Sequence, residues 1–389
     1  MISTEVGTVD FLTLGHLGDA WTTRHCRVPD GFARGKPYVK ADWQFWVHAN
    51  RYRIRDDAKF VDPSVVAEML EAIAGGSAEA EQITNENLPA LNQAFTYRRT
   101  MTVGPQKTGK GPNTATEVAY EAAGPSVFAG IAQGGEAYRC EDNGCSCGWT
   151  YPYRPGMPMG MRHPSPLIQI TATNEDQTDN IFRPLRSMIR LGPLKELLAV
   201  REGFVRVLGM SGDDDLDRID AVTASATGRL GNPISDAEQD EGGLYLKSNK
   251  LISVASVQNR GAAGMGGRTH ITTNAWDPTQ NSYAQQQYES GADDLFVFYR
   301  NPDLEPSLLD KDQRPISFHT KTNRRRIFKY VYEGSWWVNL DSIEAEAADL
   351  MKTDPAQAER FFGNRLVQGG GAWLPDGWWS AAWAGHDAT

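Results

Sequence analysis

The sequence predicts an α/β fold with a mostly parallel central sheet flanked by helices, together with a smaller C-terminal subdomain. Three observations lead to this prediction. Strand-like stretches alternate with helical stretches along the chain, which is typical of parallel sheets with helical crossovers. A glycine-rich loop lies between a predicted strand and a predicted helix. From about residue 295 onward, the alternation gives way to a largely helical tail.

The composition is that of a folded chain. Of the 389 residues, 40% are hydrophobic and 23% are charged, which excludes a disordered protein. The net charge of −10 argues against a protein whose whole surface binds nucleic acid, but it permits a local basic strip. No apolar run approaches the roughly 20 residues of a membrane span, and the four cysteines fit a reducing compartment. We therefore expect a cytoplasmic protein without a membrane partner.

The first half of the chain supplies the strand, loop and helix that define the predicted fold. Residues 63–73 place apolar side chains at helical spacing, so they predict a helix. Residues 97–103 (YRRTMTV) predict a strand, and residues 112–123 predict a helix with proline in its first turn. A segment from 129 to 166 follows, which is rich in glycine and proline and contains three of the four cysteines.

The second half continues the alternation and then changes character. Residues 167–172 (LIQITA) predict a strand, and the polar segment after it supplies an N-cap and first-turn carboxylates for a helix that reaches Ile189. Further strands are predicted at 204–208, 218–223, 234–239 and 269–273. The tail has a strand-like run at 295–299 and predicted helices near 340–353 and 355–365.

These elements predict two structural units. The first spans 1–290 and includes an N-terminal helical and aromatic extension (1–95) and the Cys/Gly/Pro-rich insertion (129–166). The second, at 291–389, is predicted to be a small lid or linker subdomain.

The loop from Gly104 to Gly111 (GPQKTGKG) fits the phosphate-binding pattern G-x-x-x-x-G-K. The backbone N–H groups of such a loop bind phosphate oxygens at a helix N-terminus, and Lys110 would neutralise the β- and γ-phosphates. Gly111 stands where Ser or Thr normally binds Mg²⁺, so magnesium would need Thr108, Asp240 or water instead. Turns rich in Gly and Lys also occur in unrelated proteins, so the loop alone does not decide between a nucleotide site and an ordinary turn.

Hydrolysis of a bound nucleotide requires one acidic residue for Mg²⁺ and a second to polarise the attacking water. Asp240 and Glu241, which follow the predicted strand at 234–239, are the best candidates. That strand is more polar than a buried central strand usually is, so the alternative is an acidic surface turn. The acidic runs at 213–215 and 293–294 are rivals that resemble solvated loops.

Two more polar sites complete the candidate nucleotide site. Thr272, Thr273 and Asn274 end the strand predicted at 269–273, where a polar residue would sense the γ-phosphate. Gln44, within the segment DWQFW, has the donor and acceptor to read adenine, with aromatic rings beside it for stacking. An aromatic core segment with one polar residue is the alternative. The candidate nucleotide-binding residues are Gln44, Gly104, Gln106, Lys107, Thr108, Gly109, Lys110 and Gly111.

The insertion contains a candidate zinc site. Cys140, Cys145 and Cys147 form the spacing C-x4-C-x-C, which would bind zinc if Cys26 or His163 supplied a fourth ligand. This spacing is not that of a standard zinc ribbon, so reduced thiols in a loop remain the alternative. The basic run at 321–329 (KTNRRRIFK) would either contact phosphates or form a solvated face.

Taken in order, these sites resemble the large terminase subunit of tailed phages, particularly its actinobacteriophage-like branch. The stretches that carry the resemblance are DWQFW, VGPQKTGKGP, HPSPLIQITATNEDQTDN, QDEGGLY, GMGGRTHITTNAWDPTQNS and DPAQAERFFGNR. Members of this family are DNA-packaging motors with an N-terminal RecA-like (ASCE) ATPase domain and a C-terminal RNase-H-like nuclease. The sequence shows no later acidic triad that would hold two metals, so we expect the nuclease domain to be absent.

The resemblance implies a role for each matched residue. Gln44 would read adenine, Gly104 to Gly111 would be the Walker A loop, and Asp240 and Glu241 would be the Walker B aspartate and the catalytic glutamate. Thr272, Thr273 and Asn274 would be the coupling motif. Arg229 (TGRLGNP) stands where the family places an arginine that acts in trans, although a solvated loop arginine is equally consistent with the sequence.

The resemblance also implies ATP and Mg²⁺ as cofactors and double-stranded DNA, a portal protein and a small terminase subunit as partners. It further implies a homo-oligomeric ring, expected to be pentameric, in the host cytoplasm, docked transiently at the portal vertex of a procapsid. Two other functions remain open: a nucleotide-binding scaffold that does not hydrolyse ATP, and another DNA-stimulated RecA-like translocase.

Overall fold

A nine-stranded sheet forms the centre of the protein, in the order β1-β13-β2-β12-β11-β7-β10-β9-β8. The structure is a computed structural model that describes residues 1–60, 62–76, 94–173, 175–210, 216–223, 232–264 and 266–369. The neighbours from β1 to β10 all pair in parallel, whereas the pairs β10–β9 and β9–β8 at one edge are antiparallel. The predicted α/β class with a mostly parallel sheet is therefore confirmed.

The strands of this sheet follow the sequence closely in the middle of the chain. They are β1 (Ile2–Ser3), β2 (Arg99–Val103), β7 (Leu167–Thr171), β8 (Leu198–Val200), β9 (Phe204–Val207), β10 (Arg218–Val222), β11 (Asp236–Asp240), β12 (Arg268–Thr273) and β13 (Leu295–Tyr299). Every residue of β7, β11, β12 and β13 is buried. Strands buried on both faces are expected where helices cover both sides of a parallel sheet.

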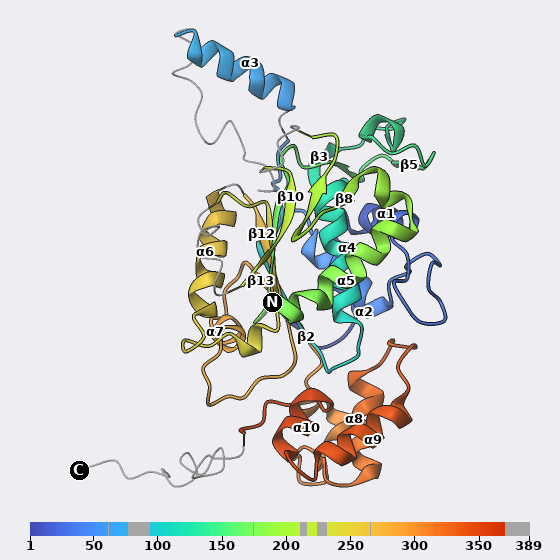
Figure 1. The fold of residues 1–389 in the computed structure, drawn as a ribbon, viewed down its shortest axis with the longest axis vertical. Coiled ribbons are helices and arrows are strands. Elements are labelled where there is room, and N and C mark those ends of the chain that lie inside the picture. Colours follow the sequence, from blue (N-terminus) through green and yellow to red (C-terminus); the bar gives the residue numbers. More distant parts are fainter. Residues whose placement is uncertain are drawn as a thin grey trace, which may run out of the picture.

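Helices form a layer on each face of the sheet (Figure 1). One layer contains α1 (Gly15–His25), α2 (Asp42–Arg51), α4 (Lys110–Ala123) and α5 (Glu175–Leu191). The other contains α6 (Leu251–Gly264) and α7 (Tyr283–Glu289). Each layer closes its own apolar core against the sheet, with Ile168 and Ile170 facing one layer and Met101 and Ile271 facing the other. Helix α3 (Pro63–Ala74) projects beyond the end of the sheet.

The predicted insertion forms two small antiparallel pairs. Strand β3 (Val127–Ile131) pairs with β6 (Pro158–Met161), and β4 (Ala137–Arg139) pairs with β5 (Thr150–Pro152). The turn between β4 and β5 contains the three cysteines of the insertion, and it packs beside the end of α1.

The C-terminal helices form a separate lobe below the sheet (Figure 1). They are α8 (Lys321–Val331), α9 (Leu340–Leu350) and α10 (Pro355–Phe361), and they enclose their own apolar cluster around Phe318, Ile327 and Phe328. We refer to residues 302–369 as the helical lobe. The strand-like run at 295–299 was predicted in this subdomain, but it is β13 of the central sheet, between β1 and β2. The sheet therefore extends beyond the predicted boundary at residue 290.

No helix within the described ranges is long and apolar enough to cross a lipid bilayer.

Candidate active site

The glycine-rich loop connects β2 to α4, as predicted from the sequence. Lys107 and Gly109 have φ values of 69° and 93°, and such left-handed geometry folds the loop tightly before the helix begins at Lys110. The Lys110 ammonium is directed back into the loop, where it donates to the carbonyls of Gly104 (2.7 Å) and Pro105 (2.9 Å). Burial lowers the pKa of Lys110, and the charges of Glu241 and Asp240 oppose this effect.

Asp240 and Glu241 lie at the carboxyl end of β11, on the same side of the sheet as the loop. Asp240 is the last residue of the strand and is 5% exposed. Glu241 adopts φ 55°, a left-handed conformation that is unfavourable for a residue with a side chain. Burial raises the pKa of Asp240, and burial together with the charge of Asp240 raises the pKa of Glu241 to about 7. Neither carboxylate forms a salt bridge with any residue that the structure describes.

Strand β12 lies between β2 and β11 and joins the two halves of the site. Its register places Thr273 opposite Val103 and Thr272 opposite Asp240. Thr272 Oγ1 donates to Asp240 Oδ1 at 2.6 Å. The carbonyl of Thr273 accepts the N–H of Gly104 at 3.0 Å.

Asn274, directly after β12, bridges the lysine and the glutamate. Its Oδ1 accepts from Lys110 Nζ at 3.0 Å, and its Nδ2 donates to Glu241 Oε2 at 3.2 Å. A change at either charged group therefore reaches the other through a single amide side chain. Thr272, Thr273 and Asn274, which the sequence suggested as sensors of the γ-phosphate, lie beside the loop and the acidic pair, and their role stays a prediction.

Gly111 is required by the packing of α4 on α5. A Cβ at this position would lie 2.6 Å from the backbone oxygen of Asn180 on α5, closer than any normal contact. The Asn180 side chain in turn donates to Asp240 Oδ2 at 3.4 Å. The departure from Ser or Thr thus has a physical reason, because the space for a side chain is taken by the neighbouring helix.

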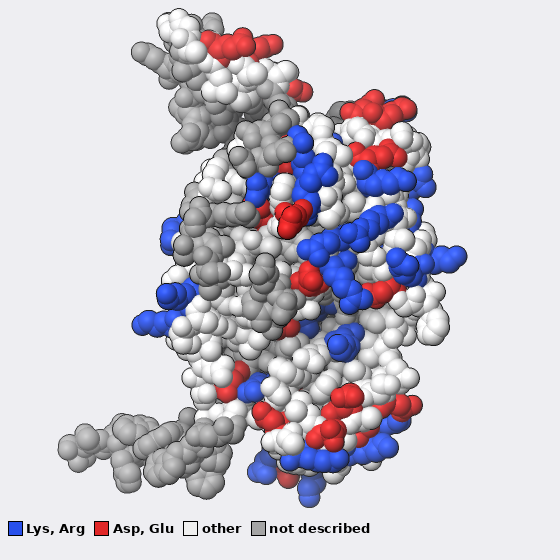
Figure 2. Space-filling model, in the orientation of Figure 1, with Lys and Arg blue, Asp and Glu red and all other residues white. Residues whose placement is uncertain are grey.

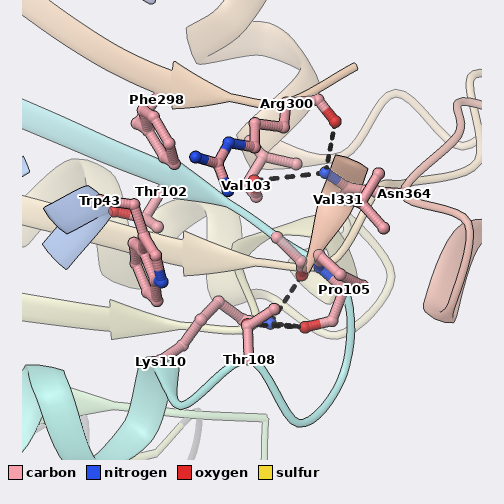
Figure 3. A pocket seen from close by; sticks show the side chains of 11 residues that line it. Trp43, Thr102, Val103, Pro105, Thr108, Lys110, Phe298, Arg300, Val331 and Asn364 are labelled. Atoms are coloured by element: carbon pink, nitrogen blue, oxygen red, sulfur yellow. Dashed lines mark hydrogen bonds between the residues drawn. The ribbon is translucent and has the colours of Figure 1, made fainter. Parts of the chain in front are cut away.

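An aromatic pocket lies beside the loop (Figure 3). Trp43 and Phe298 stack with ring centres 6.1 Å apart and planes 8° from parallel, and Lys110, Thr108 and Arg300 line the same pocket. The cavity measures only about 20 Å³, which is room for one or two water molecules.

Gln44 does not line this pocket, although the sequence suggested that it reads adenine. It is fully buried in α2, where its Oε1 accepts the N–H of Ala41 and its Nε2 donates to the hydroxyl of Tyr38. The neighbouring Trp43 faces the pocket instead (Figure 3).

The helical lobe contacts the glycine-rich loop directly. The N–H of Gln106 donates to the carbonyl of Phe361 at 2.7 Å, and the carbonyl of Gln106 accepts from the hydroxyl of Tyr332 at 2.9 Å. The indole of Trp337 lies against Gly109, so that a Cβ on this glycine would meet the ring at 2.8 Å. The lobe thus occupies backbone groups of the loop that would otherwise be free for a ligand.

A second polar cluster is buried at the opposite end of β11, and sequence reasoning missed it. Arg51 at the end of α2 binds Asp236 at 2.7 Å and Glu238 at 3.0 Å. His270 Nδ1 lies 2.8 Å from the other oxygen of Glu238. Arg268 completes the cluster with an ion pair to Glu121, and its guanidinium packs on two aromatic rings. The only sequence signal was the alternation of acidic residues in a strand that is otherwise expected to be apolar.

The remaining predicted site residues have mixed outcomes. Arg229 and the rival acidic run at 213–215 lie outside the described residues. In the basic run, Arg324 is buried and binds Glu344 at 2.6 Å, so this arginine holds α8 to α9 and does not face solvent.

The three cysteines of the predicted zinc site converge in the structure: Cys140, Cys145 and Cys147. The fourth side chain beside them is His25, whereas Cys26 and His163 are not part of this group.

Comparisons with known proteins place this geometry in a known fold. The chain is similar to the HK97 bacteriophage large terminase with a TM-score of 0.55 and 13% identity, over 92% of this chain and 56% of that one. Weaker similarity joins it to the ATPase domain of the Thermus phage P74-26 large terminase (TM-score 0.38, 11% identity, 71% and 91% covered). The large terminase of a thermophilic bacteriophage also matches (TM-score 0.33, 11% identity, 70% and 52% covered).

No protein-family model matches the chain, and no curated protein matches it in sequence. The chain spans about half the length of the HK97 protein that it matches. At this level of identity the comparison concerns the fold alone, and there it confirms the resemblance found in the sequence: the chain has the α/β fold of a phage large terminase.

Proposed function

We propose that this chain is the ATPase module of a phage terminase, which hydrolyses ATP to move double-stranded DNA into a procapsid. The observation that carries the proposal is the meeting of Lys110, Asn274 and Glu241 at the carboxyl ends of three adjacent parallel strands. Ligands of open parallel sheets bind at this edge. A partly buried lysine in a glycine-rich loop, linked through one amide to a partly buried carboxylate, suits phosphoryl transfer to water.

The residues at this edge fit a nucleotide triphosphate with Mg²⁺. The loop N–H groups and Lys110 would hold the phosphates, because both supply positive charge at the N-terminus of α4. Asp240 is buried, carries a carboxylate and forms no salt bridge with a described residue, so it would be the protein contact of the metal. Bound magnesium would neutralise charge on the phosphates. Thr272 holds Asp240 in position through its 2.6 Å hydrogen bond.

Glu241 would accept the proton of the attacking water. A general base works best when its pKa is close to the working pH, and burial brings the pKa of Glu241 to about 7. Asn274 orients this carboxylate and contacts Lys110 at the same time. Loss of a phosphate group beside Lys110 would therefore change the hydrogen bonding of Asn274, and through β12 it would reach the loop at Gly104.

DNA would contact a basic groove on α5. Figure 2 shows basic side chains gathered over this helix, and the groove is lined by Arg34, Arg183, Arg186 and Arg190 together with two aspartates. Two of the arginines are only partly neutralised, by exposed ion pairs of 3.1–3.3 Å. Arginines in such a groove bind phosphates without reading sequence, which a packaging motor requires. A ring of subunits would supply a further arginine in trans, for which Arg229 is the candidate.

The proposal is tested by ATP turnover of the full chain at several protein concentrations, with and without double-stranded DNA. We expect turnover that rises with protein concentration or with DNA, and that is lost in Glu241→Ala. The variant Arg183→Gln/Arg190→Gln should lose stimulation by DNA. The control Arg325→Gln, at an exposed arginine of α8, should keep it.

A nucleotide-binding scaffold without hydrolysis is the second candidate. Two observations favour it: Gly111 supplies no hydroxyl for Mg²⁺, and the helical lobe occupies the N–H of Gln106. If ATP binds but neither the wild type nor Glu241→Ala hydrolyses it at any protein or DNA concentration, the motor proposal fails and the scaffold replaces it.

A further inference from the structure

Three cysteines of the insertion and one histidine of α1 surround a single point in the protein. His25 Nε2 lies 3.4 Å from Cys140 Sγ, 3.7 Å from Cys145 Sγ and 3.5 Å from Cys147 Sγ. All four ligand atoms lie within 4.8 Å of one another. The four cysteines of the chain are free thiols, so no disulfide accounts for this approach.

The three nitrogen–sulfur distances match those of a tetrahedral zinc site. With Zn–S bonds of about 2.3 Å and Zn–N bonds of about 2.0–2.1 Å, tetrahedral geometry separates nitrogen and sulfur by roughly 3.5 Å. The three observed distances lie on either side of this value. A cluster of hydrogen-bonded thiols has no reason to place three sulfurs at nearly equal distances from one imidazole nitrogen.

The protein holds the histidine ring in the orientation that a metal ligand needs. His25 Nδ1 lies 2.8 Å from the carbonyl of Trp21, so this nitrogen carries the proton and Nε2 keeps a free lone pair toward the sulfurs. The ring also stacks on Trp21, with centres 4.3 Å apart, and Trp149 meets it edge-on. A zinc-bound histidine commonly donates its other ring N–H to a backbone carbonyl in this way.

The loop of the insertion is shaped so that the three sulfurs converge. Gly144 and Gly148 flank the Cys145–Cys147 pair with φ values of 79° and 71°, which other residues rarely adopt. The N–H of Cys145 donates to the carbonyl of Cys140 at 3.0 Å and closes the turn. Ser146 between the ligands donates to Glu196, which fixes the loop against the 3-10 helix at Pro193–Glu196.

We propose that His25, Cys140, Cys145 and Cys147 form a structural zinc site with no open coordination position. Its four protein ligands complete a tetrahedron, so the metal has no place for substrate and serves stability. The site attaches the insertion to the end of α1. Helix α1 in turn packs on α4 through Trp21 and Tyr120, whose rings lie 5.6 Å apart, so zinc would also support the helix that begins at Lys110. This inference does not depend on the proposed ATPase function.

The test is the metal content of the untagged full chain, purified without chelators under reducing conditions and measured by mass spectrometry of the elements. We expect about one zinc per chain in the wild type. Cys147→Ser should reduce the zinc content severalfold, and so should His25→Ala, which removes the imidazole ligand. The matched control is Cys26→Ser, a buried cysteine next to His25 that is not among the ligands.

A second measurement keeps the test decisive if a ligand variant fails to fold. Wild-type protein from which zinc has been removed is titrated with Co²⁺, which gives sulfur-to-cobalt charge-transfer bands and intense visible bands when the site is tetrahedral with thiolates. One equivalent should produce these bands, and zinc should abolish them. Wild-type protein that contains no zinc and binds neither ion would overturn the proposal, as would zinc that is lost equally in Cys26→Ser.

Discussion

Each end of strand β11 has an aspartate and a glutamate, but only the pair at the amino end contacts a cation within the described part of the chain. At the amino end, Asp236 and Glu238 contact the guanidinium of Arg51 at 2.7 and 3.0 Å. At the carboxyl end, the buried Asp240 and the partly buried Glu241 have no salt bridge to any described residue, and the amide of Asn274 links Glu241 to Lys110.

Under the proposed function, this difference separates carboxylates with a structural role from carboxylates that act on a ligand. Buried carboxylates are costly, and the protein compensates the first pair with a cation from its own chain. The second pair has no such cation among the described residues, and under the proposed function bound Mg²⁺ would compensate its charge. Both pairs are equally polar in the sequence, so residue type alone does not distinguish them. They differ in whether a cation of the same chain contacts them.

The sharpest test makes the same chemical change at both ends. Glu241→Gln should lower ATP turnover by about 10²–10⁴-fold, the usual contribution of a general base, with little change in melting temperature. Glu238→Gln should leave turnover nearly unchanged, because burial raises the pKa of Glu238 to about 8 and the amide resembles its protonated form. Steady-state kinetics and thermal unfolding of the two variants decide the matter. Equal losses of turnover would contradict the distinction.

Removing the cation from the amino end should affect stability more than chemistry. Arg51→Met removes the cation that Asp236 and Glu238 share and leaves Glu238 only its contact with His270, so we expect the free energy of unfolding to fall by about 3–5 kcal/mol. The matched control is Arg55→Met, whose ion pair with Asp57 is exposed and should contribute little to stability. Urea titrations of both variants give these values. If Arg51→Met lowers the free energy of unfolding only slightly, Arg51 is not what compensates the buried carboxylates of β11.

The pH dependence should follow the carboxyl end. Turnover should fall roughly tenfold per unit as the pH drops below about 7, because Glu241 becomes protonated and no longer accepts a proton. The effect of pH on the free energy of unfolding has the opposite sign. Because the pKa of Glu241 is raised in the folded state, this carboxyl stabilises the fold at low pH, and it loses that contribution as the pH rises from 4.5 through about 7. Glu241→Gln should therefore melt slightly higher than the wild type at pH 8, with the difference shrinking toward pH 5.

The smallest expected effect concerns Gly111. Gly111→Ser restores the residue that normally binds Mg²⁺, yet its Cβ would press on the carbonyl of Asn180 at 2.6 Å. We expect a loss of about 1–3 kcal/mol in unfolding free energy and no gain in turnover. Gly264→Ala is the control, since a Cβ there meets nothing within 4 Å. A Gly111→Ser protein that is more active than the wild type would show that α4 and α5 can separate.

Local patterns were sufficient for most of the fold. The strands at 99–103, 167–171 and 268–273 and the helix at 110–123 were predictable because each shows its own periodicity or turn chemistry. The strand at 295–299 was assigned to the wrong unit, because its neighbour β1 comes from the first residues of the chain. Pairing over almost 300 residues leaves no trace in a local pattern.

The site was predictable where its residues follow the carboxyl ends of parallel strands. Lys110, Asp240 and Asn274 could be placed together because strand ends in a parallel sheet share one edge. Arg51 was missed because it approaches β11 from 185 residues away. His25 was missed in favour of Cys26 next to it, since nothing in the sequence shows which of two adjacent side chains of a helix end faces the insertion. Gln44 was expected to read adenine, but its side chain closes the first turn of its own helix.

The N–H of Gln106 donates to the carbonyl of Phe361, so the helical lobe would compete with a bound phosphate for this N–H. A phosphate that takes this N–H must displace a group of the same chain, so the apparent dissociation constant equals the intrinsic one divided by the fraction of molecules whose loop is free. Weakening the lobe's hold, for instance at the hydroxyl of Tyr332, would tighten nucleotide binding without touching the nucleotide. By reciprocity, every bound nucleotide would release the lobe, so a chemical event at the loop becomes a displacement of a whole group of helices.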